Sequence, residues 1–460
     1  MKRRDFLKAT GIAALAPSLA LPPSSASAST VFRLEAGVIE RALTPFPDLK
    51  ASMLWTYNGA LPGPELRVKQ GEVVQAELIN ALPEPTSIHW HGIRLSNGMD
   101  GVSMLTQPPV AAGERFQYLF VPPDAGTYWY HSHAKTWQQM ARGLYGPLIV
   151  EGPDEPSVDH DVVVMIDDWR LNEAGQLDEA SFGRLHDWAH GGRLGNWLTV
   201  NGESNPSIGI KGQSRVRLRL INAANARIFR LQLANPATQY ALDGFRTPLV
   251  TVQEFELAPA QRIDLIVDVT GDLFTVTEIS TDEPYPAFAL KVDAALGVAE
   301  AAKATLSDPE PESLPDLATA RRIPLHMQGG AMGNLAEASL DGVMRPIREL
   351  AQSYQKVWAF NGVVGNMKDR LADLKLGETA IIEIWNDSQW PHAMHLHGFH
   401  FWVRDPESGK ISASRRDTHL MHGGERAELI FVADNPGLWL LHCHMLEHHA
   451  AGMGTVIQVS

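Results

Sequence analysis

The feature that most constrains the fold is a pattern that recurs three times along the chain. Each copy begins with an Asn-Gly pair and continues through a glycine, a run rich in Val, Ile and Leu, and an asparagine. The interval from that glycine to that asparagine is 9, 10 and 9 residues in the three copies, whose Asn-Gly pairs directly follow Tyr57, Val200 and Phe360. Asn-Gly turns followed by such strands are typical of hairpins, so the pattern predicts three repeated β-sandwich units.

Other short segments rich in β-branched residues support an all-β fold, because each is bounded by Pro, Gly or Asp. They are 116–121, 148–150, 161–166, 262–269 and 429–432. Helical periodicity is scarce outside 335–354, and a stretch rich in Ala, Glu and Pro predicts a linker. We therefore expect β-sandwich domains at 31–150, 158–292 and 318–460, with the linker at 293–317.

Charge and hydropathy exclude two classes of protein. The net charge of −14 disfavours nucleic acid as a partner, since phosphate binding relies on clustered Lys and Arg. No apolar stretch reaches the roughly 18 residues that a membrane-spanning helix needs, so no membrane insertion is expected.

The N-terminus resembles a twin-arginine export signal. Residues 2–8 read Lys-Arg-Arg-Asp-Phe-Leu-Lys, and a mildly apolar stretch at 9–21 precedes Ala26-Ser27-Ala28. A signal peptide at 1–28 and a periplasmic location follow. The single cysteine, Cys443, would then meet an oxidising compartment, which predicts that it is protected, for example by a metal.

Ten of the 18 histidines fall in four short clusters. Residues i and i+2 of a strand face the same side, so each His-x-His pair presents two imidazoles to one point. Imidazole is a common ligand of copper and related ions. One such pair is often structural, but four in one chain predict metal binding. The ten are His89, His91, His131, His133, His392, His395, His397, His442, His444 and His448.

The last cluster predicts a blue-copper site. Cys443 lies between His442 and His444, so on a strand its side chain points away from theirs. A thiolate, two imidazoles and a weak thioether form the blue-copper ligand set, and the candidates are Cys443, His392, His448 and Met453. A pure electron carrier needs only one such centre. The eight further histidines therefore predict that electrons are collected at a second metal group.

Taken together, the four motifs make the chain resemble a multicopper oxidase of the three-domain, laccase-like bacterial kind, similar to periplasmic copper oxidases. The resemblance implies three cupredoxin-like Greek-key β-sandwich domains and four coppers: one type 1 ion in the third domain, one type 2 ion and two type 3 ions. It places the type 2 ion at His89 and His395 and implies a trinuclear cluster of the type 2 and type 3 ions between domains 1 and 3, with domain 2 mainly a spacer. The type 3 pair would be held, in a division left open, by His91, His131, His133, His397, His442 and His444.

The resemblance also points to two acids, Asp100 near the type 2 copper and Asp417 beside the ligands, although a turn-forming role is the alternative for Asp100. Relatives often carry a proton-delivering acid where this chain has His449, so the proton route stays open. The chain also has Trp390 where copper-tolerance oxidases often have a methionine, and it lacks their methionine-rich insertion. We interpret seven histidines outside the motifs as surface or structural residues, namely His160, His186, His190, His326, His400, His419 and His422.

The predicted reaction is one-electron oxidation of a small phenolic or aromatic donor, or of a metal ion, coupled to four-electron reduction of dioxygen to water. The alternative within this class is a cuprous or ferrous metallo-oxidase of copper tolerance. A copper-free cupredoxin scaffold is disfavoured because all the ligands are kept, and a nitrite reductase because it lacks the His-Cys-His bridge. A monomer is expected.

Overall fold

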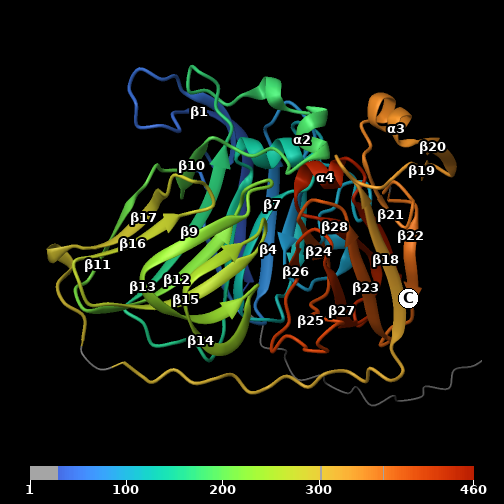
Figure 1. Cartoon of the computed structure of the whole chain (residues 1–460). Helices are drawn as coiled ribbons and strands as arrows, with labels where there is room; N and C mark the ends of the chain where they lie inside the picture. Colours follow the sequence, from blue (N-terminus) through green and yellow to red (C-terminus); the bar gives the residue numbers. More distant parts are fainter. Residues whose placement is uncertain (1–28, 301–302, 366) are drawn as a thin grey trace, which may run out of the picture.

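The computed structural model describes residues 29–300, 303–365 and 367–460, so the predicted signal peptide lies outside the described residues. Strands dominate the chain, as Figure 1 shows, and the predicted all-β fold is confirmed. The five short segments predicted as strands lie in β6, β8, β9, β15 and β27, except that Val121 falls just beyond the end of β6. Within the described residues, none of the helices has the length and apolar character that crossing a membrane requires.

The first part of the chain forms two four-stranded sheets that enclose one apolar core. Trp90 and Tyr118 are among its buried side chains. One sheet has the order β2 (Ser52–Tyr57), β1 (Ser29–Arg41), β4 (Val73–Asn80) and β6 (Arg115–Phe120). The other has the order β3 (Leu66–Lys69), β8 (Tyr145–Glu151), β7 (Gly126–Ser132) and β5 (Ile88–His91).

The middle part forms a nine-stranded sheet with its own core, to which both β9 and β17 contribute. Its first strands in order are β10 (Trp197–Val200), β9 (His160–Trp169), β12 (Ser214–Asn222), β15 (Arg262–Val269) and β13 (Phe229–Leu242). They continue with β16 (Leu273–Glu278), β17 (Tyr285–Val292) and β11 (Ser207–Ile210), while β14 (Phe245–Leu257) pairs with β13.

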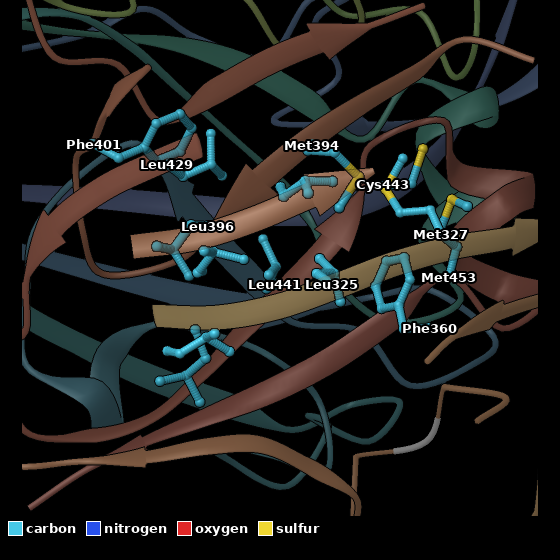
Figure 2. Close-up of a cluster of buried hydrophobic side chains, with 14 of the residues drawn as sticks. Leu325, Met327, Phe360, Met394, Leu396, Phe401, Leu429, Leu441, Cys443 and Met453 are labelled. Carbon is cyan, nitrogen blue, oxygen red and sulfur yellow. The ribbon is translucent and has the colours of Figure 1, made fainter. Parts of the chain in front are cut away.

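The last part again has two sheets around one core, and Figure 2 shows Cys443 and Met453 among the side chains of that core. One sheet has the order β21 (Trp358–Phe360), β18 (Arg321–Gly329), β23 (Thr379–Asp387), β27 (Arg426–Val432) and β25 (Trp402–Arg404). The other has the order β22 (Arg370–Leu374), β29 (Gly454–Val459), β28 (Gly437–Cys443), β24 (His392–Leu396) and β26 (Thr418–Met421).

The repeated Asn-Gly pairs form the same kind of turn in all three parts of the chain. Asn58, Asn201 and Asn361 and their following glycines all have φ between 51° and 75°, the left-handed geometry of a type I′ turn. Each asparagine side chain also donates to a backbone carbonyl of its own part's first strand: Arg33, Val163 and Pro324. Each of these strands then pairs in parallel with the strand of its repeat, β1 with β4, β9 with β12, and β18 with β23.

The helices are short. Of the stretch 335–354, only α3 (Ile347–Tyr354) is helical, while β19 (Glu337–Leu340) and β20 (Val343–Pro346) form a hairpin. Asp341-Gly342 between them has φ of 51° and 78°, again a type I′ turn, which overrides the helical periodicity. Within the predicted linker 293–317, the described residues contain one 3-10 turn at Ala294–Leu296 and no strand. The remaining helices are α1 (Thr136–Gln139), α2 (Leu185–Ala189), α4 (Leu446–Ala450) and four 3-10 turns at Asn97–Met99, Met140–Arg142, Glu179–Ser181 and Ala294–Leu296.

Candidate metal centres

Strand pairing brings the histidine motifs together. In the first sandwich β5 pairs with β7, which sets His89 opposite His131. In the last sandwich β24 pairs with β28, which sets His395 opposite His442 and Met394 opposite Cys443. Because neighbours along a strand alternate, the histidines flanking Cys443 lie in one group and Cys443 lies in another.

Eight histidines from the first and last sandwiches form the larger group. They meet in three sets, two of which share His91, and within each set the candidate ligand atoms lie within 4.8 Å of one another. The sets are His91, His131 and His444; His133, His397 and His442; and His89, His91 and His395. Two facing pairs of nitrogens are close: His397 Nε2 is 3.1 Å from His442 Nε2, and His444 Nε2 is 3.5 Å from His131 Nε2.

Backbone carbonyls orient several of these rings. The Nδ1–H groups of His89, His131, His395 and His442 can each donate to a carbonyl oxygen, at 2.8, 3.0, 2.8 and 2.9 Å. This arrangement leaves each Nε2 as the nitrogen with a free lone pair, the usual orientation of a metal-bound histidine.

The larger group suits a soft or borderline cation. Burial lowers the pKa of His91, His131, His133, His397, His442 and His444 well below the usual value, so these rings are neutral at pH 7. Within this group, five buried ring nitrogens have no hydrogen-bond partner among the described residues: His89 Nε2, His91 Nδ1, His133 Nε2, His395 Nε2 and His444 Nδ1. Neutral, buried and unpartnered imidazole nitrogens facing one another are the donor set that copper takes.

The smaller group consists of His392, Cys443 and His448, all buried. Cys443 Sγ is 3.5 Å from His392 Nδ1 and 3.9 Å from His448 Nδ1, and the two Nδ1 atoms are 3.0 Å apart. Burial raises the pKa of the Cys443 thiol to about 12, a cost that a bound cation would offset. Met453 lies in the same core, and its carbonyl accepts the Cys443 N–H at 3.1 Å.

The Nε2 atoms of His392 and His448, on the far side of each ring from the thiol, also have hydrogen-bond partners. His392 Nε2 is 3.0 Å from Ser388 Oγ, and His448 Nε2 can donate to the carbonyl of His190 at 2.6 Å. Both imidazoles are therefore fixed with Nδ1 facing the thiol.

The two acids flagged in the sequence both contact the larger group. Asp100 Oδ2 is 3.0 Å from His397 Nδ1, and its Oδ1 is 3.2 Å from His89 Nδ1. Asp417 Oδ1 is 3.1 Å from His91 Nε2, while its backbone carbonyl is 2.8 Å from His395 Nδ1. A purely local turn role for Asp100 does not account for its contacts with both histidines.

Arg262, on β15 of the middle sheet, was not foreseen. Its Nη1 and Nη2 donate to the two carboxylate oxygens of Asp417 at 2.8 and 2.6 Å, and the whole pair is buried. Burial raises the pKa of Asp417, but Arg262 and the histidine hydrogen bonds outweigh it and hold that pKa well below its usual range. The prediction that the middle domain is mainly a spacer is wrong here, because it supplies the charge that keeps Asp417 ionised.

His449 lies against the larger group. Its ring centroid is 4.3 Å from that of His442, and burial, with a contribution from Lys356, lowers its pKa to about 4. Of the seven histidines outside the motifs, His400 is buried and can donate from Nε2 to the Gly92 carbonyl at 2.7 Å, a structural role.

Comparison with known proteins agrees with this geometry. The multicopper oxidase family matches residues 40–155 and again residues 344–460, and each range contains two of the four histidine clusters. Multicopper oxidase MmcO of Mycobacterium tuberculosis is 29% identical to this chain, over 98% of this chain and 95% of its own length.

Two solved structures are similar to this chain, and each alignment covers 94% of this chain and 100% of the other chain. The multi-copper oxidase from Pseudomonas thermotolerans is 31% identical with a TM-score of 0.80. Lac15 from a marine microbial metagenome is 36% identical with a TM-score of 0.73.

Proposed function

This chain belongs to the multicopper oxidase family, and we propose that its two buried groups hold four coppers, one of type 1, one of type 2 and a type 3 pair. Membership makes the protein a copper-dependent oxidoreductase that uses dioxygen as its electron acceptor and reduces it to water.

We assign the smaller group to the type 1 ion, with His392, Cys443 and His448 as strong ligands and Met453 as the weak one. The three close ligand atoms and the apolar core around them support this assignment. For the larger group we assign His89 and His395 to type 2. One type 3 ion takes His91, His131 and His444, and the other takes His133, His397 and His442. The two separate sets of three histidines carry this division.

Copper, when bound, cycles between its +1 and +2 states and so supplies the one-electron steps that reduce dioxygen. The chain supplies the connection between the two groups. Cys443 lies in one group, and its covalent neighbours His442 and His444 lie in the other. A single peptide bond on each side of Cys443 therefore connects the two groups. Consecutive Cα atoms are about 3.8 Å apart, which keeps the path short.

Reduction of dioxygen also consumes protons. We propose that Asp100 relays them, because its carboxylate touches both His397 and His89. Asp417 is a positioning residue, since Arg262 keeps it ionised and it orients His91 and His395. His449, buried against His442, occupies the place of the acid that relatives use, and its low pKa makes it neutral at pH 7.

We further propose phenols and aromatic amines as electron donors. Trp390 lies two residues from His392, and its side chain packs in the third core beside the type 1 group. The chain also lacks a methionine-rich insertion. The test is oxygen consumption by the copper-loaded protein with a dimethoxyphenol, cuprous ion and ferrous ion side by side, with Cys443→Ser as control.

Phenol oxidation without added copper supports this donor class. Phenol turnover that depends strictly on added cupric ion points instead to a metallo-oxidase. No oxygen consumption with any of the three donors, in protein that carries its copper, contradicts the oxidase assignment itself.

A periplasmic monomer exported by the twin-arginine pathway completes the proposal. The signal-like residues 1–28 support the periplasmic location. Replacement of Arg3 and Arg4 by Lys should therefore retain the protein in the cytoplasm. Cell fractionation and sedimentation test location and oligomeric state.

A further inference from the structure

The smaller metal group depends on a very short helix. α4 spans five residues, and its third residue is His448, which we assign as a ligand of the type 1 ion. A helix of about one turn has little stability of its own, because starting a helix costs more free energy than a single turn returns. The position of His448 must therefore be set by contacts between α4 and the rest of the protein.

The middle part of the chain supplies several of these contacts. The first residue of α4, Leu446, is buried in a core that it shares with Ala223. α2 packs against α4, and His448 Nε2 can donate to the carbonyl of His190 at 2.6 Å. The residue between Leu446 and His448 is Glu447, which is only 1% exposed. A carboxyl group in such a place needs a hydrogen-bond partner.

Asn225 is that partner. It lies between β12 and β13 and is itself only 4% exposed. Its Nδ2 donates to Glu447 Oε1 at 3.0 Å and to the carbonyl of Trp137 at 2.7 Å. Its backbone carbonyl accepts the N–H of Leu446 at 3.0 Å. Trp137 belongs to α1 and lies four residues after His133, so one residue of the middle part joins the segments that follow a histidine motif in each outer part.

The Glu447 carboxyl group has few other contacts. Its Oε2 has no hydrogen-bond partner among the described residues, and a Cβ placed on Gly192 would lie 3.4 Å from that oxygen. Burial raises the pKa of Glu447, and the hydrogen bond from Asn225 is the strongest of the contacts that oppose this rise. Loss of the Asn225 amide would therefore leave a poorly satisfied buried acceptor on α4, which is costly.

We propose that Asn225 is a positioning residue for the type 1 group, because its amide holds α4, and with it His448, against the middle part and α1. Its hydrogen bonds go to Glu447 and to backbone atoms, so it acts on His448 through the helix. This role rests on the proposed type 1 site and extends it to a residue outside the domain that holds the ligands.

Asn225→Ala tests this role in the copper-loaded protein. Hydrogen exchange followed by mass spectrometry should show that peptides containing α4 exchange about tenfold faster than in the unchanged protein, since the unsatisfied acceptor favours local opening. Redox titration should show a higher type 1 potential, because an imidazole that is held less firmly stabilises the cupric ion less. The electron paramagnetic resonance signal of the type 2 ion should be unchanged.

Asn80→Ala is the matched control. Asn80 is a fully buried asparagine of the first part, and its Nδ2 also donates two hydrogen bonds, to the carbonyls of Glu84 and Val110. Its replacement should lower the stability of the protein but leave both the exchange of α4 and the type 1 potential unchanged. A residue of merely structural value at position 225 would behave in the same way.

Two further variants complete the test. Asn225→Ser also removes the amide, and it should show the same two changes if the alanine variant does not fold. Glu447→Gln keeps a side-chain oxygen that can accept from Asn225, so its α4 should exchange as slowly as in the unchanged protein. Fast exchange in Glu447→Gln would mean that the charge of Glu447, and not its hydrogen bond, holds the helix, which contradicts the proposal.

An unchanged type 1 potential in a folded Asn225 variant would overturn the positioning role, whatever the stability of that variant. Equal changes in Asn80→Ala would overturn it as well. Failure of the proposed type 1 site looks different, because the unchanged protein loaded with copper would then have no blue absorption and no type 1 potential to measure. Exchange of α4 would still show whether Asn225 holds that helix.

Discussion

Arg262→Met should destabilise the protein strongly, because it leaves Asp417 as an unpaired buried carboxylate. The side chains of Arg262 and Asp417 are only 0% and 1% exposed, and two hydrogen bonds of 2.8 and 2.6 Å join them. Methionine is shorter than arginine but has a similar volume and keeps the unbranched apolar stem, so the change mainly removes the charge and the hydrogen bonds. Breaking one partner of a buried ion pair costs about 3–5 kcal/mol.

Urea unfolding of the copper-loaded protein, followed by tryptophan fluorescence, measures this loss. At a slope of about 3 kcal/mol/M, a loss of 4 kcal/mol moves the midpoint down by more than about 1 M. Copper analysis should show partial loss from the larger group, since Asp417 orients His91 and His395, while the blue absorption of the type 1 ion persists.

Two further variants separate charge from general damage. Arg230→Met removes an exposed arginine of the same sheet that pairs with Glu254, and exposed pairs contribute at most about 1 kcal/mol. Arg262→Met combined with Asp417→Asn removes the unpaired charge and should regain part of the lost stability. If Arg262→Met unfolds at the same urea concentration as Arg230→Met, Arg262 does not supply the charge that Asp417 needs.

Three other outcomes are expected. Copper-free protein should lose stability as the pH falls below about 6.5, because burial lowers the pKa of His392, His397 and other ligands in the folded state and only the unfolded chain takes up protons. Each such histidine removes about 1.4 kcal/mol per pH unit until its own folded pKa is reached, about 4 for His448, and thermal unfolding at pH 7.5 and 5.5 should show a larger difference without copper than with it. Cys443→Ser should abolish the blue colour and the oxidase activity but keep most of the histidine-bound copper, and turnover at a comparable rate would contradict the assigned electron path. Met453→Leu should keep copper and colour and change packing by less than about 1.5 kcal/mol, while redox titration shows a higher type 1 potential; an unchanged potential means that Met453 is not a ligand.

Local periodicity explains why so much of the fold and of the candidate site could be predicted from the sequence. Asn-Gly needs two left-handed residues in succession, and few other pairs adopt that geometry, so the three turns at Asn58, Asn201 and Asn361 were recognisable. The alternation of a strand likewise separates Cys443 from its two histidine neighbours. Both signals span only a few residues, which is why they can be read without knowing how the domains pack.

Contacts between distant segments lack such a signal. Arg262 is 155 residues from Asp417, and nothing near either residue in the sequence marks the pair. The same holds for the carbonyl of His190, 258 residues from the ring of His448 that it contacts. A backbone oxygen has no residue type, so no motif could have shown that α2 covers the type 1 group.

These two contacts give the middle part of the chain a role at both metal groups. Through Arg262 it holds the charge of Asp417 beside the larger group, and through the His190 carbonyl it contacts His448 of the smaller group. The two contacts come from different elements, β15 and the residue that follows α2, so each can be changed without the other. A substitution near His190 should therefore alter the smaller group, whereas one at Arg262 should alter copper retention and oxygen reduction. The middle part of the chain thus contacts both metal groups, although the histidine motifs that define those groups lie entirely in the outer domains.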